Sequence, residues 1–349
     1  MPPLHVTAVA FATALVLLVA LRPLAVALGF VDRPNCSRKS HVGEVPLHGG
    51  LAIFSGLVVA VYGDPALGAH GHALIAVSAF MVMLGMADDR FDLRPRVRLI
   101  AHLAAALVLV LGMHYRVQDL GDLLGIGVLW LGPLSLPFTV VACVALVNAF
   151  NMLDGLDGLA AGTATMAFVG VIGFSMGAYA PTSVLVACGM AGSLLAFLCF
   201  NAPALFNRPL RVFMGDGGST LLGFVLAAVG ILLVQDTRTN VPPVLLLWLM
   251  PLPVFELFST TFRRLRNGQS PAAADAGHYH HRLIRAGLSG RQVFLLYVAV
   301  SGLGAAFAVA FLWTGVPDIV AFIAFLGFFA AWHRFVTAAP RFASPVLVP

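Results

Sequence analysis

Four short polar segments interrupt an otherwise strongly apolar sequence, and they contain most of the side chains that could take part in chemistry. In chain order they are Asp88-Asp89 with Asp92, residues 148–158 (NAFNMLDGLDG), residues 213–219 (FMGDGGS) and residues 278–282 (HYHHR). Carboxylates bind hard divalent cations, while glycine-rich turns and basic side chains bind phosphate groups. The residue types therefore indicate a site for a divalent cation and a phosphorylated ligand.

The adjacent carboxylates of Asp88 and Asp89 indicate a bound cation, because two like charges repel each other unless a positive charge lies beside them. Magnesium usually takes one or two carboxylates together with substrate phosphates. Mg²⁺ is therefore the cofactor that we expect, with Mn²⁺ as the alternative. For Asp92, an ordinary solvated loop charge is an equally good interpretation.

Glycines flank Asp154, Asp157 and Asp216. Glycine permits a close approach of the backbone to a phosphate, and a helix that begins just after Asp216 would direct its positive N-terminus at the same ligand. Close packing between membrane helices, where small residues are common, is the alternative explanation. It does not account for an acid flanked by three glycines at the start of a helix.

The histidine-rich segment has a less specific pattern. His278, His280 and His281 could bind a transition metal, but no cysteine or further histidine lies nearby at a usual spacing. Together with Arg282, the three imidazoles are better suited to a pyrophosphate, as cations and hydrogen-bond donors. A solvated basic loop is the remaining alternative.

The first basic loop contains Arg38, Lys39 and His41. These side chains would contact substrate phosphates or, alternatively, lipid head groups. Gly49-Gly50, at the start of the next apolar segment, would provide only a close helix contact.

The composition shows which elements must position these residues. The chain has 349 residues, of which 60% are hydrophobic and 10% are charged, and its mean hydropathy is +0.96. Soluble domains carry about 25% charged residues, so a soluble enzyme and a disordered chain are both excluded. We predict an all-α polytopic membrane protein, with residues 1–349 forming one integral membrane domain. Its eleven expected spans are 4–29, 47–62, 72–87, 97–113, 136–152, 158–176, 181–200, 218–235, 243–262, 292–314 and 318–336.

The distribution of Lys and Arg predicts the orientation. Of the 20 basic residues, 17 lie in the loops after spans 1, 3, 7 and 9 or near the C-terminus, which places these regions in the cytoplasm and the N-terminus in the periplasm. The net charge of +5 is explained by these loops and not by nucleic acid. Two spans separate successive polar segments, so all four segments would meet at the cytoplasmic face. The expected cytoplasmic loops are about 30–46, 88–96, 151–158, 201–217 and 263–291.

Residues 118–137 contain several glycines and prolines, which break regular helices. Short apolar alternations between them favour a small, non-spanning β-hairpin on the periplasmic side. The alternative is a twelfth span at about 120–135, which would reverse the orientation of everything that follows.

The residues alone thus predict a Mg²⁺-dependent transferase that acts on a lipid phosphate. Phosphoryl transfer requires positioning and cations more than covalent chemistry. A membrane transporter is the competing class, but transporter sites lie near the middle of the bilayer, whereas these acids lie at the ends of spans.

The polar segments, together with GFVDRPNCSRKSHVGEVPLHGG, MADDRFDLRP, FNAPALFNRPLRVFMGDGGS and SPAAADAGHYHHRL, occur in the order typical of one enzyme family. The sequence resembles the polyprenyl-phosphate N-acetylaminosugar-1-phosphate transferases (the MraY/WecA superfamily), in the WecA-like branch. The resemblance spans residues 29–283. It implies transfer of an N-acetylaminosugar 1-phosphate from a UDP-aminosugar to undecaprenyl phosphate, with release of UMP, at the bacterial inner membrane. Such a step initiates lipid-linked cell-surface glycan synthesis, such as that of O-antigen, and the usual assembly of relatives is a homodimer.

The resemblance also implies roles for individual residues. Asp88 matches an acid proposed as a base or phosphate-activating group, Asp89 lies beside it, and Asp216 matches the metal ligand, with Asp89 as a second ligand. The nucleotide site would be lined by Asn151, Asp154, Asp157, Asn201 and Phe213, with Phe213 stacking on uracil, and closed by the loop of His278, His280, His281 and Arg282. A phosphate monoester has a second pKa of about 6, so Asp88 could instead orient the lipid phosphate or the metal.

Two departures from the MraY pattern concern the donor. The histidine segment reads GHYHHRL instead of PLHHHFE, and Val42 occupies the position of a lysine before the glycine pair. Lys39 or His41 would take over that role. Both differences favour a small donor, UDP-GlcNAc first, over UDP-MurNAc-pentapeptide, with UDP-FucNAc or UDP-QuiNAc as alternatives.

Overall fold

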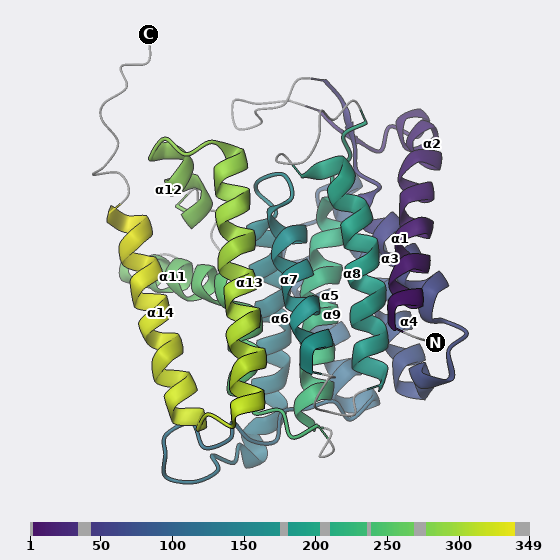
Figure 1. Ribbon diagram of the computed structural model, residues 1–349. Helices are drawn as coiled ribbons and strands as arrows, with labels where there is room; N and C mark the ends of the chain where they lie inside the picture. The colour runs from purple at the N-terminus through teal and green to yellow at the C-terminus, as the bar shows by residue number, and fades with distance from the viewer. Residues whose placement is uncertain are drawn as a thin grey trace.

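The computed structural model describes residues 3–33, 43–174, 181–202, 210–235, 239–268 and 277–338. This part of the chain is mainly helical, and most of the helices lie side by side in one bundle (Figure 1). The N-terminal half contains α1 (Pro3–Ala20), α2 (Arg22–Ala27), α3 (Gly49–Val61), α4 (Gly68–Phe91), α5 (Pro95–Leu107), α6 (Ser135–Leu153) and α7 (Leu159–Phe174). The C-terminal half contains α8 (Pro181–Asn201), α9 (Gly215–Gln235), α10 (Val244–Leu249), α11 (Pro251–Arg266), α12 (Tyr279–Arg285), α13 (Gly290–Thr314) and α14 (Asp318–Ala338).

The helices form where the sequence is apolar, because a chain in lipid must satisfy its backbone polar groups within each segment. Their ends follow local signals. Asp92, with φ of 49°, ends α4 in the left-handed conformation, and Pro95 begins α5. Ser289 and Gln292 form a reciprocal capping box at the start of α13, and left-handed Gly315 ends that helix.

Seven segments of the described chain are long and apolar enough to cross a membrane: 65–91, 95–112, 132–153, 181–201, 215–235, 290–314 and 318–338. Shorter apolar helices cover 4–20, 49–61 and 159–174. The protein is therefore a helical membrane protein, as predicted. The number of eleven spans, the orientation of the termini and the single-domain organisation stay predictions.

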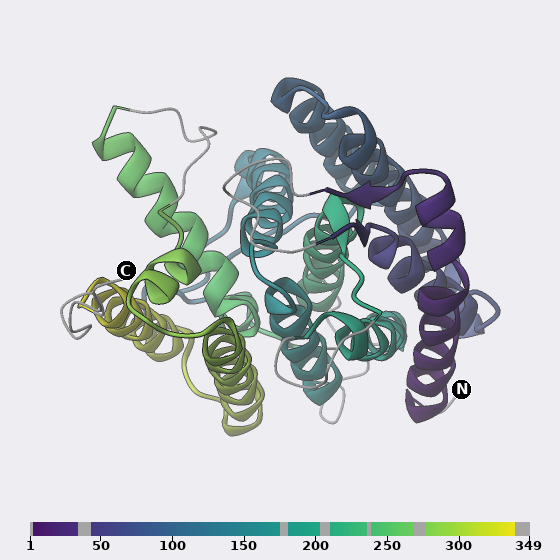
Figure 2. The same ribbon diagram turned by 90° about the horizontal axis from the view of Figure 1, so that it is seen from above.

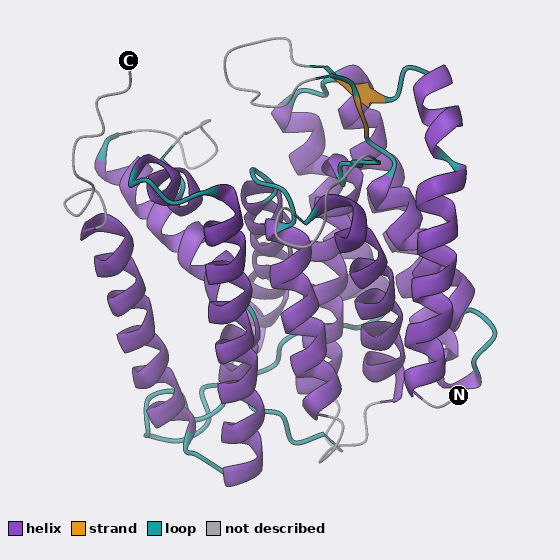
Figure 3. Cartoon of the chain, turned by 45° about the horizontal axis from the view of Figure 1, so that its top comes forward, coloured by secondary structure: helices purple, strands orange, loops and turns teal. Residues whose placement is uncertain are grey.

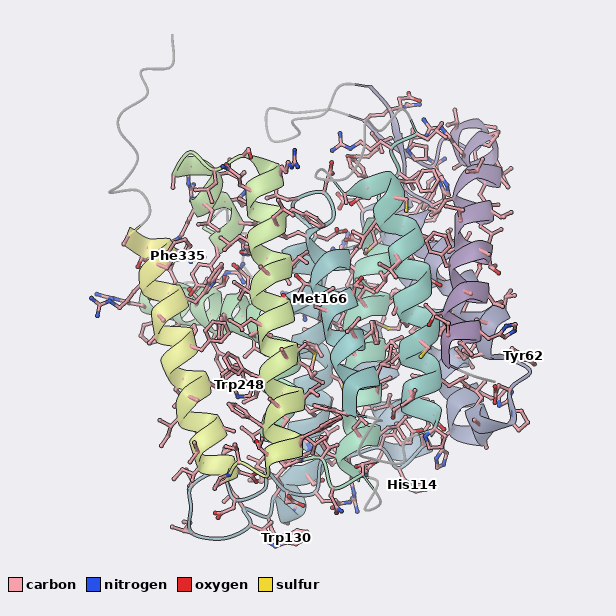
Figure 4. All side chains as sticks on the ribbon, in the orientation of Figure 1. Tyr62, His114, Trp130, Met166, Trp248 and Phe335 are labelled. Carbon is pink, nitrogen blue, oxygen red and sulfur yellow. The ribbon has the colours of Figure 1, made fainter. Side chains whose placement is uncertain are left out.

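The predicted span 243–262 is not one straight helix. It is divided at Met250, whose backbone (φ −131°, ψ 50°) is not helical, and Pro251 then begins α11. Trp248 holds the preceding turn in place, since its indole N–H donates to the carbonyl oxygen of Ala321 at 3.0 Å; Figure 4 places this side chain between α13 and α14. After the break, α11 runs across the bundle (Figures 1 and 2).

Helix α9 is almost entirely buried and packs against α4, α6 and α3. Glycines permit this close packing. A β-carbon added at Gly85 of α4 would lie 2.3 Å from the Cα of Gly217, and one at Gly50 of α3 would lie 2.4 Å from the backbone nitrogen of Gly218. The first turn of α9 is thus held between two neighbouring helices at backbone contact.

The segment predicted as a periplasmic hairpin turns back on itself around an isolated bridge between Asp119 and Trp130. The N–H of Leu120 donates to the carbonyl oxygen of Leu129 at 3.0 Å, but neither arm is a regular strand. No helix covers 114–131, so the alternative of a twelfth span is wrong. Trp130 lies at the end of the bundle opposite α12 (Figure 4).

The two named strands, β1 (Val31–Asp32) and β2 (Val45–Pro46), form an antiparallel pair that the sequence did not predict. They lie at the other end of the bundle from the 118–131 turn (Figure 3). The N–H of Phe213 donates to the carbonyl oxygen of Pro46 at 2.9 Å, so β2 supports the chain that leads into α9.

Candidate active site

The structure brings residues of all four polar segments together where α4 and α6 end and α9 begins. The N–H of Asp216 donates to Oδ1 of Asp89 at 3.0 Å, which joins the first and third segments. The second and fourth meet at Gly155, where a β-carbon would lie 2.6 Å from Nε2 of His280. The carboxylates of Asp216 and Asp89 are also close enough to raise the pKa of Asp154, which joins the two pairs. Segments far apart in sequence therefore form one site, as predicted from their spacing. Which side of the membrane it faces remains a prediction.

Asp88 is buried and has a hydrogen-bond partner on each oxygen. The N–H of Leu93 donates to Oδ1 at 2.9 Å, and Nη1 of Arg98 donates to Oδ2 at 2.7 Å. The same guanidinium nitrogen lies 3.7 Å from Oδ2 of Asp216. This geometry arises because the chain turns back after α4, so the first turns of α5 return to the acids. Arg98 thus neutralises part of the acidic centre, a role that the sequence analysis did not assign to it.

Asp89 is placed beside Asp216 by the turn before α9. Gly215 has a φ of +71°, and a β-carbon there would lie 2.4 Å from Oδ2 of Asp89, so only glycine fits. Oδ2 of Asp89 is buried, and no described residue donates a hydrogen bond to it. A buried carboxylate oxygen of this kind is unfavourable unless a cation or donor reaches it.

The donor set fits a hard cation that is completed by substrate. No group of three or more His, Cys, Asp or Glu side chains is arranged for a metal within the described residues. Mg²⁺ needs only one or two carboxylates when phosphates provide the other ligands. Asp89 accepts a hydrogen bond from the backbone N–H of Asp216, and the two carboxylates repel each other electrostatically. These residues fit Mg²⁺, which stays a prediction.

The carboxylate loop, residues 154–158, is connected to the chain before α9. Arg211 forms an ion pair with Asp157, and its guanidinium carbon lies 4.8 Å from the centre of the Phe213 ring. Asn201 accepts a hydrogen bond from the N–H of Gly158 and donates one to the carbonyl oxygen of Val212 at 2.7 Å. Asn201 therefore ties two loops together, and its place in the nucleotide site stays a prediction.

Asp154 is the most electrostatically perturbed acid in this loop. Burial raises the pKa of Asp154 well above its ordinary value, and the neighbouring carboxylates of Asp216, Asp89 and Asp157 raise it further. A cation that neutralises this cluster would reverse the effect. Asn151 lies half-buried in the last turn of α6, one turn before Asp154.

The histidine segment, residues 278–282, begins α12. Nδ1 of His278 lies 2.7 Å from Oε1 of Glu256, and the ring of His280 lies 4.2 Å from that of His281, measured between centroids. Burial lowers the pKa of His280 well below its ordinary value, and His281 and His278 add to the shift. Burial also lowers the pKa of His281. Nε of Arg282 donates to the carbonyl oxygen of Gly277 at 3.0 Å, so this guanidinium helps to shape its own turn.

The remaining predicted residues divide into two groups. Arg38, Lys39 and His41 lie outside the described residues. The N–H groups of Gly49 and Gly50 donate to the carbonyl oxygens of Phe213 and Met214 at 3.0 and 2.9 Å, so this glycine pair makes the close contact expected of it.

Carboxylates paired with arginine, glycine turns and an adjacent aromatic ring thus lie together at one end of a bundle of apolar helices. Residues 72–234 match the model of Glycosyl transferase family 4. The chain is 33% identical to the undecaprenyl-phosphate alpha-N-acetylglucosaminyl 1-phosphate transferase of Escherichia coli (strain K12) over 311 residues, 87% of this chain and 83% of the relative.

Proteins of the same name from Haemophilus influenzae and Yersinia pestis are also similar. The first is 35% identical over 335 residues, which cover 94% of this chain and 91% of the relative. The second is 35% identical over 288 residues, which cover 81% and 77%. The chain belongs to Glycosyl transferase family 4, together with these transferases.

Proposed function

We propose that the protein transfers N-acetylglucosamine 1-phosphate from UDP-GlcNAc to undecaprenyl phosphate and releases UMP, the initiating step of a lipid-linked cell-surface glycan. One observation supports this most directly: Asp88, Asp89 and Asp216 converge beside Arg98 at the start of α9. The names of the relatives, which cover most of the chain, indicate the donor and acceptor.

In the proposed reaction, an oxygen of the lipid phosphate attacks the β-phosphorus of the sugar nucleotide. The new bond forms as the bond from the β-phosphorus to the bridging oxygen breaks, and UMP leaves with that oxygen. The attacking phosphate is mostly ionised at neutral pH, since its second pKa is about 6. Because both oxygens of Asp88 already accept hydrogen bonds, its geometry favours orienting Arg98 and the acceptor over abstracting a proton.

Asp89 and Asp216 would hold Mg²⁺, which would stabilise the negative charge that moves onto the leaving phosphate. Arg211 lies over one face of the Phe213 ring, and the other face would stack on the uracil base. Asn151, Asp154 and Asp157 would line the same site. The histidine segment would approach the sugar nucleotide from the other side of the carboxylate loop.

The proposed location is the bacterial inner membrane, with the site at its cytoplasmic face. A lipid acceptor reaches the site within the membrane and a nucleotide donor from the water, so the end of a helix bundle is a suitable place for the reaction. A cysteine introduced at Asp157 should react with a membrane-impermeant reagent only from the cytoplasmic side. Labelling from outside would contradict this orientation.

The test is UMP release by the purified protein supplied with undecaprenyl phosphate, Mg²⁺ and one of three donors: UDP-GlcNAc, UDP-GalNAc or UDP-MurNAc-pentapeptide. We expect release from UDP-GlcNAc, and loss of release with EDTA or with the Asp216→Asn variant. Preference for another donor would refute the sugar assignment. Full activity under complete chelation would refute the role of the metal.

A further inference from the structure

Glu256 is a buried carboxylate to which the proposed chemistry assigns no role. It lies in the middle of α11, and its side chain is only 2% exposed. A buried charge is costly unless it is paired. Oε1 accepts hydrogen bonds from Nδ1 of His278 at 2.7 Å and from the hydroxyl of Thr260 at 3.2 Å, while Oε2 accepts one from the N–H of Tyr279 at 3.1 Å. Glu256 therefore binds both a side chain and the backbone at the start of the histidine segment.

The contacts continue from His278 to the carboxylate loop. The rings of His278 and His280 are stacked, with planes 6° apart and centroids 5.6 Å apart. His280 is fully buried, and neither of its ring nitrogens has a hydrogen-bond partner among the described residues. Its Nε2 packs so closely on Gly155 that a β-carbon there would lie 2.6 Å away. A continuous series of contacts thus joins Glu256 to the loop that carries Asp154 and Asp157.

A second contact holds the segment from behind. The hydroxyl of Tyr279 lies 2.8 Å from Nδ1 of His333 on α14, and the Tyr279 ring is buried against Trp332. The histidine segment is therefore attached to α11 on one side and α14 on the other. Of these anchors, only Glu256 is charged and contacts a histidine of the segment directly.

We propose that Glu256 is a positioning residue, which holds the histidine segment against the carboxylate loop so that the segment can bind the sugar nucleotide. This inference rests on the function proposed above. Nδ1 of His278 is engaged by the carboxylate, at 2.7 Å from Oε1 of Glu256. The other ring nitrogen, Nε2, is then the one available to a ligand.

The test compares Glu256→Gln with the wild-type protein in the UMP-release assay. Glutamine keeps the shape of the side chain but removes the charge and one of the two acceptor oxygens. We expect the KM for UDP-GlcNAc to rise about tenfold, which is the size of effect that loss of one charge-assisted contact produces. The KM for undecaprenyl phosphate should stay at the wild-type value. Thr260→Val is the matched control, because Thr260 contacts Glu256 but not the histidine segment, and both of its KM values should be unchanged.

A double variant tests whether Glu256 acts through His278. Glu256→Gln combined with His278→Ala should raise the KM for UDP-GlcNAc no further than His278→Ala alone. Additive effects would overturn this route. If Glu256→Gln does not fold, His278→Ala decides the matter, because the same selective rise in KM is expected and an unchanged KM would overturn the proposal.

The possible failures are distinguishable. A wild-type protein that releases no UMP would refute the proposed function itself. An active wild-type protein with an unchanged KM in Glu256→Gln would refute only the positioning role. So would a loss of active protein with both KM values unchanged, since that pattern indicates a purely structural residue.

Discussion

Replacing Arg98 by methionine should weaken catalysis while tightening the binding of Mg²⁺. Arg98 lies 2.7 Å from Asp88 and 3.7 Å from Asp216, so its guanidinium lowers the negative charge that a metal would meet. At 3.7 Å, Coulomb's law with an effective dielectric constant of about 20 gives an upper limit of about 4 kcal/mol. The side chains of Arg98 and Asp216 are 34% and 31% exposed, so solvent screening reduces this to about 1 kcal/mol.

That free energy corresponds to about a fivefold lower Mg²⁺ concentration for half-maximal UMP release. The same change leaves Asp88 buried without its cation, which should lower kcat by tenfold or more, since an orphaned charged hydrogen bond costs about 1.5–3 kcal/mol. A titration of UMP release against Mg²⁺ measures both effects. Arg96→Met is the matched control, because Arg96 is an exposed arginine two residues earlier on α5. The reasoning would be refuted if the Mg²⁺ concentration for half-maximal release fell in both variants. It would also be refuted if that concentration rose in Arg98→Met.

Two further predictions concern stability. Gly85→Ala should destabilise the protein by about 1–3 kcal/mol, because the added methyl group overlaps the backbone of Gly217. The control is Gly327→Ala, on an open face of α14, which should leave the melting temperature unchanged. Equal melting temperatures for the two variants would show that the contact between Gly85 and Gly217 is loose. The lowered pKa of His280 means that this histidine binds a proton more readily in the unfolded chain than in the folded one. The contribution of buried, neutral His280 to the free energy of unfolding is therefore complete above about pH 6.5 and is lost as the pH falls below that value. Between pH 7 and pH 5, the melting temperature should therefore fall less steeply for His280→Leu than for the wild type. Identical slopes of melting temperature against pH would contradict this account.

The sequence predicted the convergence of the polar segments because the argument needed only the number of apolar segments between them. Two apolar segments separate each successive pair of polar segments, which returns the chain to the same end of the bundle. The contacts of Asp89 with Asp216 and of Gly155 with His280 follow from that parity. The geometry of the acidic centre could not be predicted in the same way. Arg98 is one of several arginines after Asp89, and only the turn between α4 and α5 selects it.

The break at Met250 shows a different limit. Composition alone made 243–262 a plausible span, and a proline at the start of a helix is compatible with a continuous helix after it. The break falls at the residue before Pro251, where a proline disfavours helical backbone. The turn before the break is also held by Trp248, which donates to the carbonyl oxygen of Ala321, a contact 73 residues away that no local pattern contains. The small β1–β2 pair was missed for a related reason, since two-residue strands carry almost no periodic signal.

The glycine contacts at the start of α9 have a consequence for how the enzyme could open and close. Backbone packed on backbone, as at Gly85 with Gly217 and Gly50 with Gly218, leaves no side chain that could change rotamer to permit sliding. Asp216 is therefore part of a stationary frame, and the carboxylates of Asp88 and Asp89 are fixed relative to it. We expect substrate entry and product exit to depend on the opposite wall, where each contact that holds α12 involves a side chain, such as those of Glu256 and His333, that could change rotamer. A compound that wedges between α12 and the carboxylate loop would then block turnover without displacing any of these three acids.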